Sequence, residues 1–268
     1  MTTERRQIDI EGLAFRLIVS PRPAASTTPT IVLVHGIGMS HRYLARLHRV
    51  LARSARVVSI DLPGFGGLPK PGYDPDVPRM GRALAEVIST LGDARVVLVG
   101  HSMGAQWVVE AAAQLPGVVA AVVAIGPVVD QENRTLSAQV RALAMDTLGE
   151  TPRINAIVFS DYVRCGPRWY LTQVRHMLAY PIEQRVRALE VPLLVIRGEK
   201  DPVAGRDWCR RLTAAAWSAR LVHVPRRHHV VQESAPLAVA DAILSHTASA
   251  HPGSAPEPVM TSTTLGTP

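Results

Sequence analysis

The sequence is poor in aromatic side chains, which limits the side chains that its core can use. It also has no long apolar run, which excludes a membrane-spanning helix. Only 4% of its 268 residues are Phe, Trp or Tyr, so we expect a core and any pocket built mainly from Ala, Val and Leu. No apolar run approaches the ~20 residues of a membrane-spanning helix, so no membrane span is predicted. The N-terminal stretch MTTERRQIDIEG is polar and lacks the apolar segment of a signal peptide. These absences predict a cytoplasmic protein.

Cysteine pairs, metal-binding patterns and blocks of basic residues are missing as well. Cys165 and Cys209 are the only cysteines and stand far apart, so we expect two free thiols rather than a disulfide. No spacing of Cys and His indicates a metal site, and the sequence predicts neither a metal ion nor a cofactor. Lys and Arg number 29 against 22 for Asp and Glu, but the arginines are scattered. We therefore expect no nucleic-acid partner.

The chain does contain what a buried sheet needs, with 47% apolar residues. Apolar and polar residues alternate on both sides of Glu11-Gly12, which is typical of a β-hairpin. Short continuous apolar runs follow, separated mostly by helical patterns; they cover 30–34, 56–60, 95–99, 118–125, 192–196 and 219–224. Continuous apolar strands favour a parallel sheet that is buried on both faces. The pattern predicts an α/β fold with a doubly wound, mostly parallel sheet.

One long interval interrupts this alternation. Between Ile125 and Pro192 the sequence contains helical patterns and no convincing strand. Such an excursion predicts a helical cap over 128–187, inserted after the sixth strand and lying over the C-terminal edge of the sheet. The core would then comprise 1–127 and 188–247. The remainder, 248–268, is rich in Pro, Ser, Thr and Gly and predicts a disordered tail.

The most specific signal surrounds Ser102. It lies between Gly100 and Gly104 in the segment GHSMG, directly after an apolar run and before a helical pattern. A G-x-S-x-G segment at a strand-to-helix junction is typical of a nucleophile elbow, in which the serine takes a strained conformation. The two glycines remove side chains that would collide in so tight a turn. We therefore predict that Ser102 is a catalytic nucleophile.

Two further loops extend this pattern. The segment HGIG follows the third strand and begins at His35, and DLPGFG follows the fourth strand and begins at Asp61. Together with GHSMG, in this order and spacing, these segments resemble the α/β-hydrolase superfamily over roughly residues 7–246. His35 and Asp61 match positions of that family, and we expect them to shape loops rather than take part in the reaction.

The resemblance also implies where the remaining groups lie. The oxyanion hole of the family corresponds here to the backbone N–H groups of Met103 and Ile37. The family carries its acid after the seventh strand, in a segment that reads GEKDPV here, which makes Asp201 the candidate. Glu199 is a weaker choice. Asp130 is a second alternative, because some family members move the acid to the end of the preceding strand.

The general base should follow the last strand, where His228 and His229 are adjacent. One family spacing, counted back from Glu233, selects His228. Another, H-x-L-Q-E-x-x-P, agrees in spacing with HVVQESAP and selects His229. We prefer His229 and expect His228 to be a pocket or loop residue.

The sequence thus predicts a serine hydrolase with the triad Ser102, Asp201 and His229, which cleaves a small-molecule carboxylic ester or lactone through an acyl-enzyme. Alternatives are a hydrolase of C–C bonds in diketone-type substrates and a non-catalytic, ligand-binding member of the fold. Trp169 and Tyr170 are the candidates for lining the substrate pocket.

Overall fold

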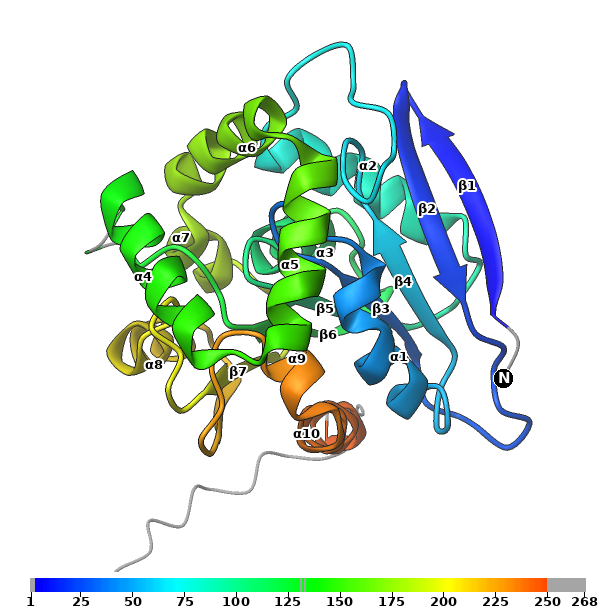
Figure 1. The fold of residues 1–268 in the computed structure, drawn as a ribbon. Helices are drawn as coiled ribbons and strands as arrows, with labels where there is room; N and C mark the ends of the chain where they lie inside the picture. The colour runs from blue at the N-terminus through cyan, green and yellow to red at the C-terminus, as the bar shows by residue number, and fades with distance from the viewer. Residues whose placement is uncertain (1–2, 131, 133, 250–268) are drawn as a thin grey trace, which may run out of the picture.

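The computed structural model describes residues 3–130, 132 and 134–249 (Figure 1). Its centre is one eight-stranded sheet in the order β1-β2-β4-β3-β5-β6-β7-β8. The strands are Glu4–Ile10 (β1), Leu13–Val19 (β2), Thr30–Val34 (β3), Val57–Asp61 (β4), Val96–His101 (β5), Val119–Ile125 (β6), Leu193–Gly198 (β7) and Ala219–Val224 (β8). The pairs β1–β2 and β2–β4 are antiparallel, and every other pair is parallel. The predicted α/β fold with a mostly parallel sheet is confirmed.

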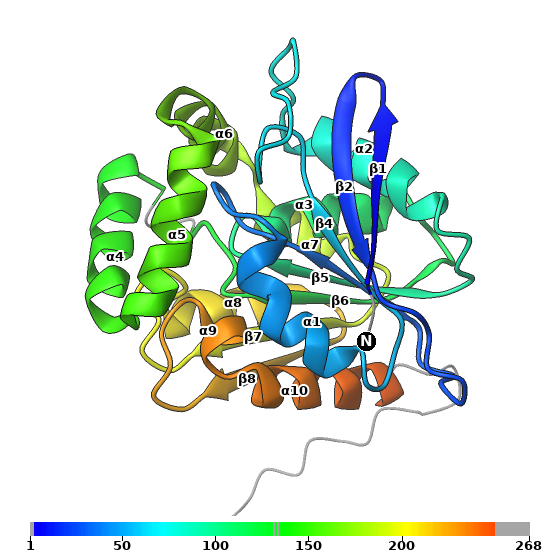
Figure 2. The same ribbon diagram turned by 45° about the vertical axis from the view of Figure 1, so that its right-hand side comes forward.

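Helices cover both faces of the sheet (Figures 1 and 2). They are His41–Leu44 (a 3-10 turn), Ala45–Leu51 (α1), Val77–Ser89 (α2), Gly104–Ala113 (α3), Arg206–Ala215 (α8), Val231–Ser234 (α9) and Pro236–Ser249 (α10). Helices α1 and α10 pack against each other on one face, and α2 packs against α3 on the other. The predicted hairpin turn is present, and Glu11 and Gly12 both have positive φ, at 50° and 78°.

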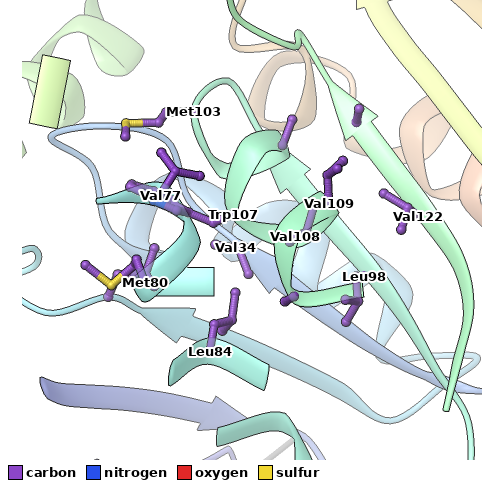
Figure 3. Close-up of a cluster of buried hydrophobic side chains, with 14 of the residues drawn as sticks. Val34, Val77, Met80, Leu84, Leu98, Met103, Trp107, Val108, Val109 and Val122 are labelled. Carbon is purple, nitrogen blue, oxygen red and sulfur yellow. The ribbon is translucent and has the colours of Figure 1, made fainter. Parts of the chain in front are cut away.

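Alternation along the strands divides the core into two apolar clusters, one on each face of the sheet. On β3, for example, Val32 and Val34 point to the α2–α3 side, whereas Ile31 and Leu33 point to the α1–α10 side. Figure 3 shows part of the first cluster, where Trp107 of α3 is buried among side chains of α2 and of the central strands. The central strands β3 and β6 are buried at every position because both of their faces are covered, which explains their nearly continuous apolar sequence.

Four helices lie between β6 and β7, namely Leu136–Gly149 (α4), Pro152–Cys165 (α5), Pro167–Ala179 (α6) and Ile182–Arg187 (α7). We call α4–α7 the insertion. It follows the sixth strand, as predicted, and α4, α5 and α6 lie beside the sheet on one side of the molecule (Figures 1 and 2). Residues 248 and 249, placed by the sequence in the tail, belong to α10, and 250–268 lie outside the described residues. Within the described part of the chain, no helix is both long and apolar enough to cross a membrane.

Candidate active site

Ser102 occupies a tight turn between β5 and α3. Its φ is 55°, in the left-handed region that a residue with a side chain adopts at a cost of about 1–3 kcal/mol. A Cβ on Gly100 would collide with the backbone of Gly104, and a Cβ on Gly104 would come within 2.5 Å of the His35 carbonyl oxygen. The two glycines are therefore required by close backbone approach. Ser102 thus takes the strained, left-handed conformation that the sequence predicts for this turn.

His229 and Asp201 form a buried pair in loops that follow β8 and β7. The ring Nδ1 of His229 lies 2.9 Å from Oδ2 of Asp201, whose side chain has no exposed surface. Because the carboxylate can only accept, Nδ1 carries the proton, and Nε2 of the neutral ring is left as an acceptor. That Nε2 has no hydrogen-bond partner among the described residues. Ser102 and His229 line the same cavity.

The charges of this pair stabilise each other. Burial by itself would raise the pKa of Asp201, but the ring of His229 and the backbone N–H groups of Val203 and Ala204 outweigh it and lower that pKa. The two N–H groups donate to Oδ1 at 2.8 and 2.9 Å. Burial likewise works to lower the pKa of His229, and the opposite charge of Asp201 reverses this, so that the pKa is raised. The carboxylate thus favours the protonated form of the imidazole.

The alternative residues have other partners. Asp130 forms an ion pair with Arg211 at 2.6 Å, and Glu199 accepts the backbone N–H of Arg226 at 2.8 Å. The Nδ1 of His228 lies 4.0 Å from Asp146 and forms no hydrogen bond with the described residues. Of the candidates considered from the sequence, only Asp201 and His229 are paired with each other.

Two backbone N–H groups lie next to Ser102. Met103 directly precedes the first residue of α3, and Ile37 lies in the loop after β3. That loop contacts the serine, since a Cβ on Gly36 would lie 3.0 Å from Cβ of Ser102. Neither N–H donates to an acceptor within the described residues. Ile37 also lines the cavity, whereas Met103 is buried and does not.

A buried hydrogen-bond chain connects the loop after β3 to the histidine. The N–H of Gly36 donates to the Tyr43 hydroxyl at 2.7 Å, and this hydroxyl lies 2.8 Å from Nδ1 of His101. The Nε2 of His101 lies 3.0 Å from the carbonyl oxygen of His229. Burial lowers the pKa of His101 to about 3, so its ring is neutral and can accept at Nδ1 and donate at Nε2.

The insertion holds the other side of the same histidine. Oδ1 of Asp146, at the end of α4, accepts the backbone N–H of His229 at 2.8 Å. Oε1 of Glu150, which follows α4, accepts the N–H of Val230 at 3.0 Å. Burial raises the pKa of both carboxyl groups. The backbone of His229 is thus held by His101 through its carbonyl and by Asp146 through its N–H.

The cavity in front of Ser102 is mainly apolar. Among the residues that the structure describes, no Lys or Arg lines it, and the charged side chains other than histidine are Asp146 and Glu150. Its apolar and aromatic residues from the insertion are Leu136, Val140, Leu143, Ile154, Val158, Tyr162, Tyr170, Val174 and Met177.

The two aromatic residues expected in the pocket lie in different places. Tyr170 lines the cavity beside Tyr162, with ring centroids 5.1 Å apart. Trp169 is not among the lining residues. Its indole packs against Gly64 and the ring of Phe65, at 6.2 Å between centroids, because successive residues of α6 point to different sides of the helix.

His35 and Asp61 bind the loops around the site to one another. The backbone N–H of Leu62 donates to Nε2 of His35 at 3.0 Å. Asp61 is buried and pairs with Arg16 at 3.0 Å and with His41 at 2.7 Å. These contacts fit the expected structural roles, because neither side chain lines the cavity.

The described residues contain no disulfide and no candidate metal site. Cys165 and Cys209 are both free and buried, and burial raises the pKa of their thiols to about 11 and about 12. Among the described residues no group of three or more His, Cys, Asp or Glu side chains could hold a metal ion.

Comparison with known proteins agrees with this geometry. The sequence profile of the alpha/beta hydrolase family matches residues 31–242, and the chain belongs to that family. The expectation of an α/β hydrolase is thereby confirmed at the level of the family.

Individual relatives are more distant. An uncharacterized protein of Mycobacterium tuberculosis is 33% identical over 117 residues, which cover 42% of this chain and 34%, about a third, of the relative. The 2-(acetamidomethylene)succinate hydrolase of Mesorhizobium japonicum is 24% identical over 86% of this chain and 90% of its own length. A solved serine hydrolase involved in carbazole degradation (CarC enzyme) has a TM-score of 0.75 at 22% identity, covering 92% of this chain and 99% of that one. The last likeness supports the fold alone.

The sequence did not predict the roles of His101, Tyr43, Asp146 and Glu150. His101 is part of the GHSMG segment, and its place at the end of β5 was a signal that could have marked it. No local signal marks Tyr43, Asp146 or Glu150, because their partners lie far away in the sequence.

Proposed function

We propose that this chain is a serine hydrolase that cleaves a carboxylic ester or a lactone through an acyl-enzyme at Ser102. One observation carries the proposal: His229, which is paired with the buried Asp201, lines the same cavity as a serine held at a left-handed turn. A serine hydroxyl is a weak nucleophile unless a base removes its proton, and the unpartnered Nε2 of His229 is the base that this cavity offers.

The reaction follows from the positions of these groups. The hydroxyl oxygen of Ser102 attacks the acyl carbonyl while its proton passes to Nε2 of His229. The carbonyl oxygen becomes negative and is stabilised by the N–H groups of Ile37 and Met103. The imidazolium then gives its proton to the leaving alcohol as the carbon–oxygen bond breaks. Water, deprotonated by His229, hydrolyses the acyl-enzyme and regenerates Ser102. Asp201 orients the ring and stabilises its charge throughout.

The lining of the cavity supports an apolar acyl or alcohol group. Side chains such as Leu143 and Met177 offer no charge to a substrate, and no Lys or Arg is present to pair with an acidic one. Arg175 of α6 is paired with Asp74 at 2.6 Å. We therefore expect uncharged esters and lactones to be preferred over esters that carry a carboxylate.

The test is hydrolysis of p-nitrophenyl acetate, butyrate and octanoate, together with a panel of lactones. We expect a burst of p-nitrophenolate equal to the enzyme concentration, followed by steady turnover. Ser102→Ala should reduce turnover by a factor on the order of 10⁴ or more, whereas Ser245→Ala, on the exposed side of α10, should have no effect. Undiminished turnover in Ser102→Ala, or no hydrolysis of any ester or lactone by the wild type, would contradict the proposal.

A further inference from the structure

Exposed apolar side chains gather on the insertion. Among the described residues, seven of the nine large apolar side chains that are exposed lie there. We call these seven the outer face; they are Leu136, Val140, Met145, Leu148, Phe159, Val163 and Leu171. Leu148 is 89% exposed and Phe159 is 72% exposed. They lie on the three consecutive helices α4, α5 and α6, and large exposed apolar patches mark interaction surfaces.

The outer face follows the helical repeat. On α5 the exposed positions Pro152, Ala156, Phe159 and Val163 are spaced as i, i+4, i+7 and i+11, so they form one apolar stripe along the helix. The opposite side of α5 carries Ile154 and Val158, which line the cavity. Helix α5 therefore presents apolar residues both to the cavity and to the solvent.

The exposed charged side chains on α4, α5 and α6 are all positive. The acids on α4, α5 and α6 are Asp146 and Asp161, and both are buried. The exposed charged residues are arginines, among them Arg141, Arg153 and Arg168. The outer face is therefore apolar and basic, without an exposed carboxylate on the same three helices.

The outer face is continuous with the mouth of the cavity. Leu136 and Val140 on α4 are 47% and 57% exposed, and both also line the cavity in front of Ser102. In Figure 2, α4 and α5 lie next to each other on the side of the molecule away from β1. A molecule bound on the outer face would thus contact the entrance of the cavity.

We propose that the outer face docks on an anionic lipid surface. Apolar side chains flanked by arginine bind at the boundary between headgroups and acyl chains, and anionic headgroups strengthen this binding. A second copy of the chain is a poorer occupant, because like-charged arginines would meet and the chain carries a net charge of +7. The protein would lie on the surface, since no described helix is long enough to cross it. Building on the proposed esterase activity, the same contact would let apolar esters enter the cavity from the lipid.

Flotation with lipid vesicles tests the docking without reference to the reaction. Wild type and Ser102→Ala are mixed with vesicles of phosphatidylcholine alone and with vesicles that also contain phosphatidylglycerol. Both proteins should float with the anionic vesicles, and high salt should weaken the binding. Leu148→Gln and Phe159→Gln should each weaken it by about ten-fold, because a large apolar side chain is lost from the contact. Leu237→Gln is the matched control, since Leu237 is 61% exposed on α10, outside the insertion.

Each outcome has a distinct meaning. Turnover of a soluble acetate ester should be unchanged in Leu148→Gln and Phe159→Gln, because neither residue lines the cavity. Equal binding by these two variants and by Leu237→Gln would overturn the proposal, as would absence of binding to anionic vesicles. A dimer in sedimentation that Phe159→Gln dissociates, without vesicle binding, would assign the outer face to self-association instead. Vesicle binding by a protein that hydrolyses no ester would leave the docking intact and contradict only the proposed function.

Discussion

Two regions enclose the cavity, the sheet side and the insertion, and their side chains differ in burial and in hydrogen bonding. On the sheet side, Asp201 and His101 are buried. Both carboxylate oxygens of Asp201 and both ring nitrogens of His101 have hydrogen-bond partners. On the insertion side, α4 buries only Gln139 and Asp146 and exposes much of its apolar surface. The first region fixes atoms in place, and the second mainly provides apolar contact area.

This difference separates the parts of the molecule that perform chemistry from those that select a substrate. Groups that act at the reacting carbon must be held closely, whereas groups that bind remote parts of a substrate tolerate variation. Asp146 and Glu150 are the exception, because they belong to the insertion and yet hold the backbone at His229. The predictions below test which residues act in the reaction and which select the substrate.

The largest expected effect concerns the paired histidines on the sheet side. His229→Ala should lower kcat by a factor on the order of 10³ or more, because the general base and the later general acid are lost together. His228→Ala should cost far less, because His228 has no contact with Asp201. The measurement is the kcat of both variants with p-nitrophenyl butyrate, which shows which histidine is the base. Reversed losses would make His228 the base.

A second prediction separates the two aromatic residues of α6. Trp169→Ala should lower the free energy of unfolding by about 3 kcal/mol, because a buried indole that packs on Phe65 is lost. Tyr170→Ala should instead change KM along the series of acetate, butyrate and octanoate esters, because Tyr170 lines the cavity. Thermal unfolding and ester kinetics are measured on both variants, with the exposed Trp217→Ala as the control. A larger shift in chain-length preference for Trp169→Ala than for Tyr170→Ala would contradict this placement.

The third prediction tests whether Asp146, which belongs to the insertion, positions His229. Asp146→Ala removes the acceptor of the His229 N–H and should lower kcat by about ten-fold, since a buried N–H is left without a partner. Asp146→Asn keeps an oxygen acceptor and should recover most of this loss. Asp241→Ala, on the exposed side of α10, provides the control. Equal kcat in all four proteins would show that the insertion does not position the base.

The smallest expected effect is a shift in the pH profile. His229 must be neutral to act as the base, so the rate falls as the pH drops below its pKa. Burial acts to lower that pKa, but Asp201 outweighs it, and Asp146 and Glu150 act in the same direction as Asp201. Asp146→Asn removes one of these negative charges, so the pKa of His229 should fall. The acid limb of kcat/KM should therefore move to lower pH, and a move to higher pH would contradict the assignment.

Much of the fold could be predicted because its signals are local. Strands such as β3 and β6 are nearly continuous apolar runs that are buried on both faces of the sheet, and the turn at Ser102 needs glycines at 100 and 104 that are visible in the sequence. The segments that contain Asp201 after β7 and His229 after β8 are also short, and their resemblance to the corresponding segments of the α/β-hydrolase superfamily selects these two residues. These residues could therefore be selected before any coordinates were known.

The remaining features depend on how distant segments pack. A carboxylate on a helix, such as Asp146, normally indicates a solvated surface, and its contact with His229 depends on where α4 is placed against the core. Trp169 was expected in the pocket because aromatic residues are scarce, but its environment is set by Gly64 and Phe65, roughly a hundred residues earlier in the chain. Tyr43 meets His101 only because the loop after β3 and the end of β5 adjoin in the sheet.

The most direct test of the central claim is the site of covalent labelling by a serine-directed fluorophosphonate, read by mass spectrometry of the digested protein. The phosphorus centre imitates the tetrahedral carbon, so labelling requires the nucleophile, the base and the two N–H donors together. The account predicts one adduct, on the peptide that contains Ser102, absent in Ser102→Ala and formed much more slowly in His229→Ala than in His228→Ala. An adduct on another residue, or no adduct at all, would contradict it.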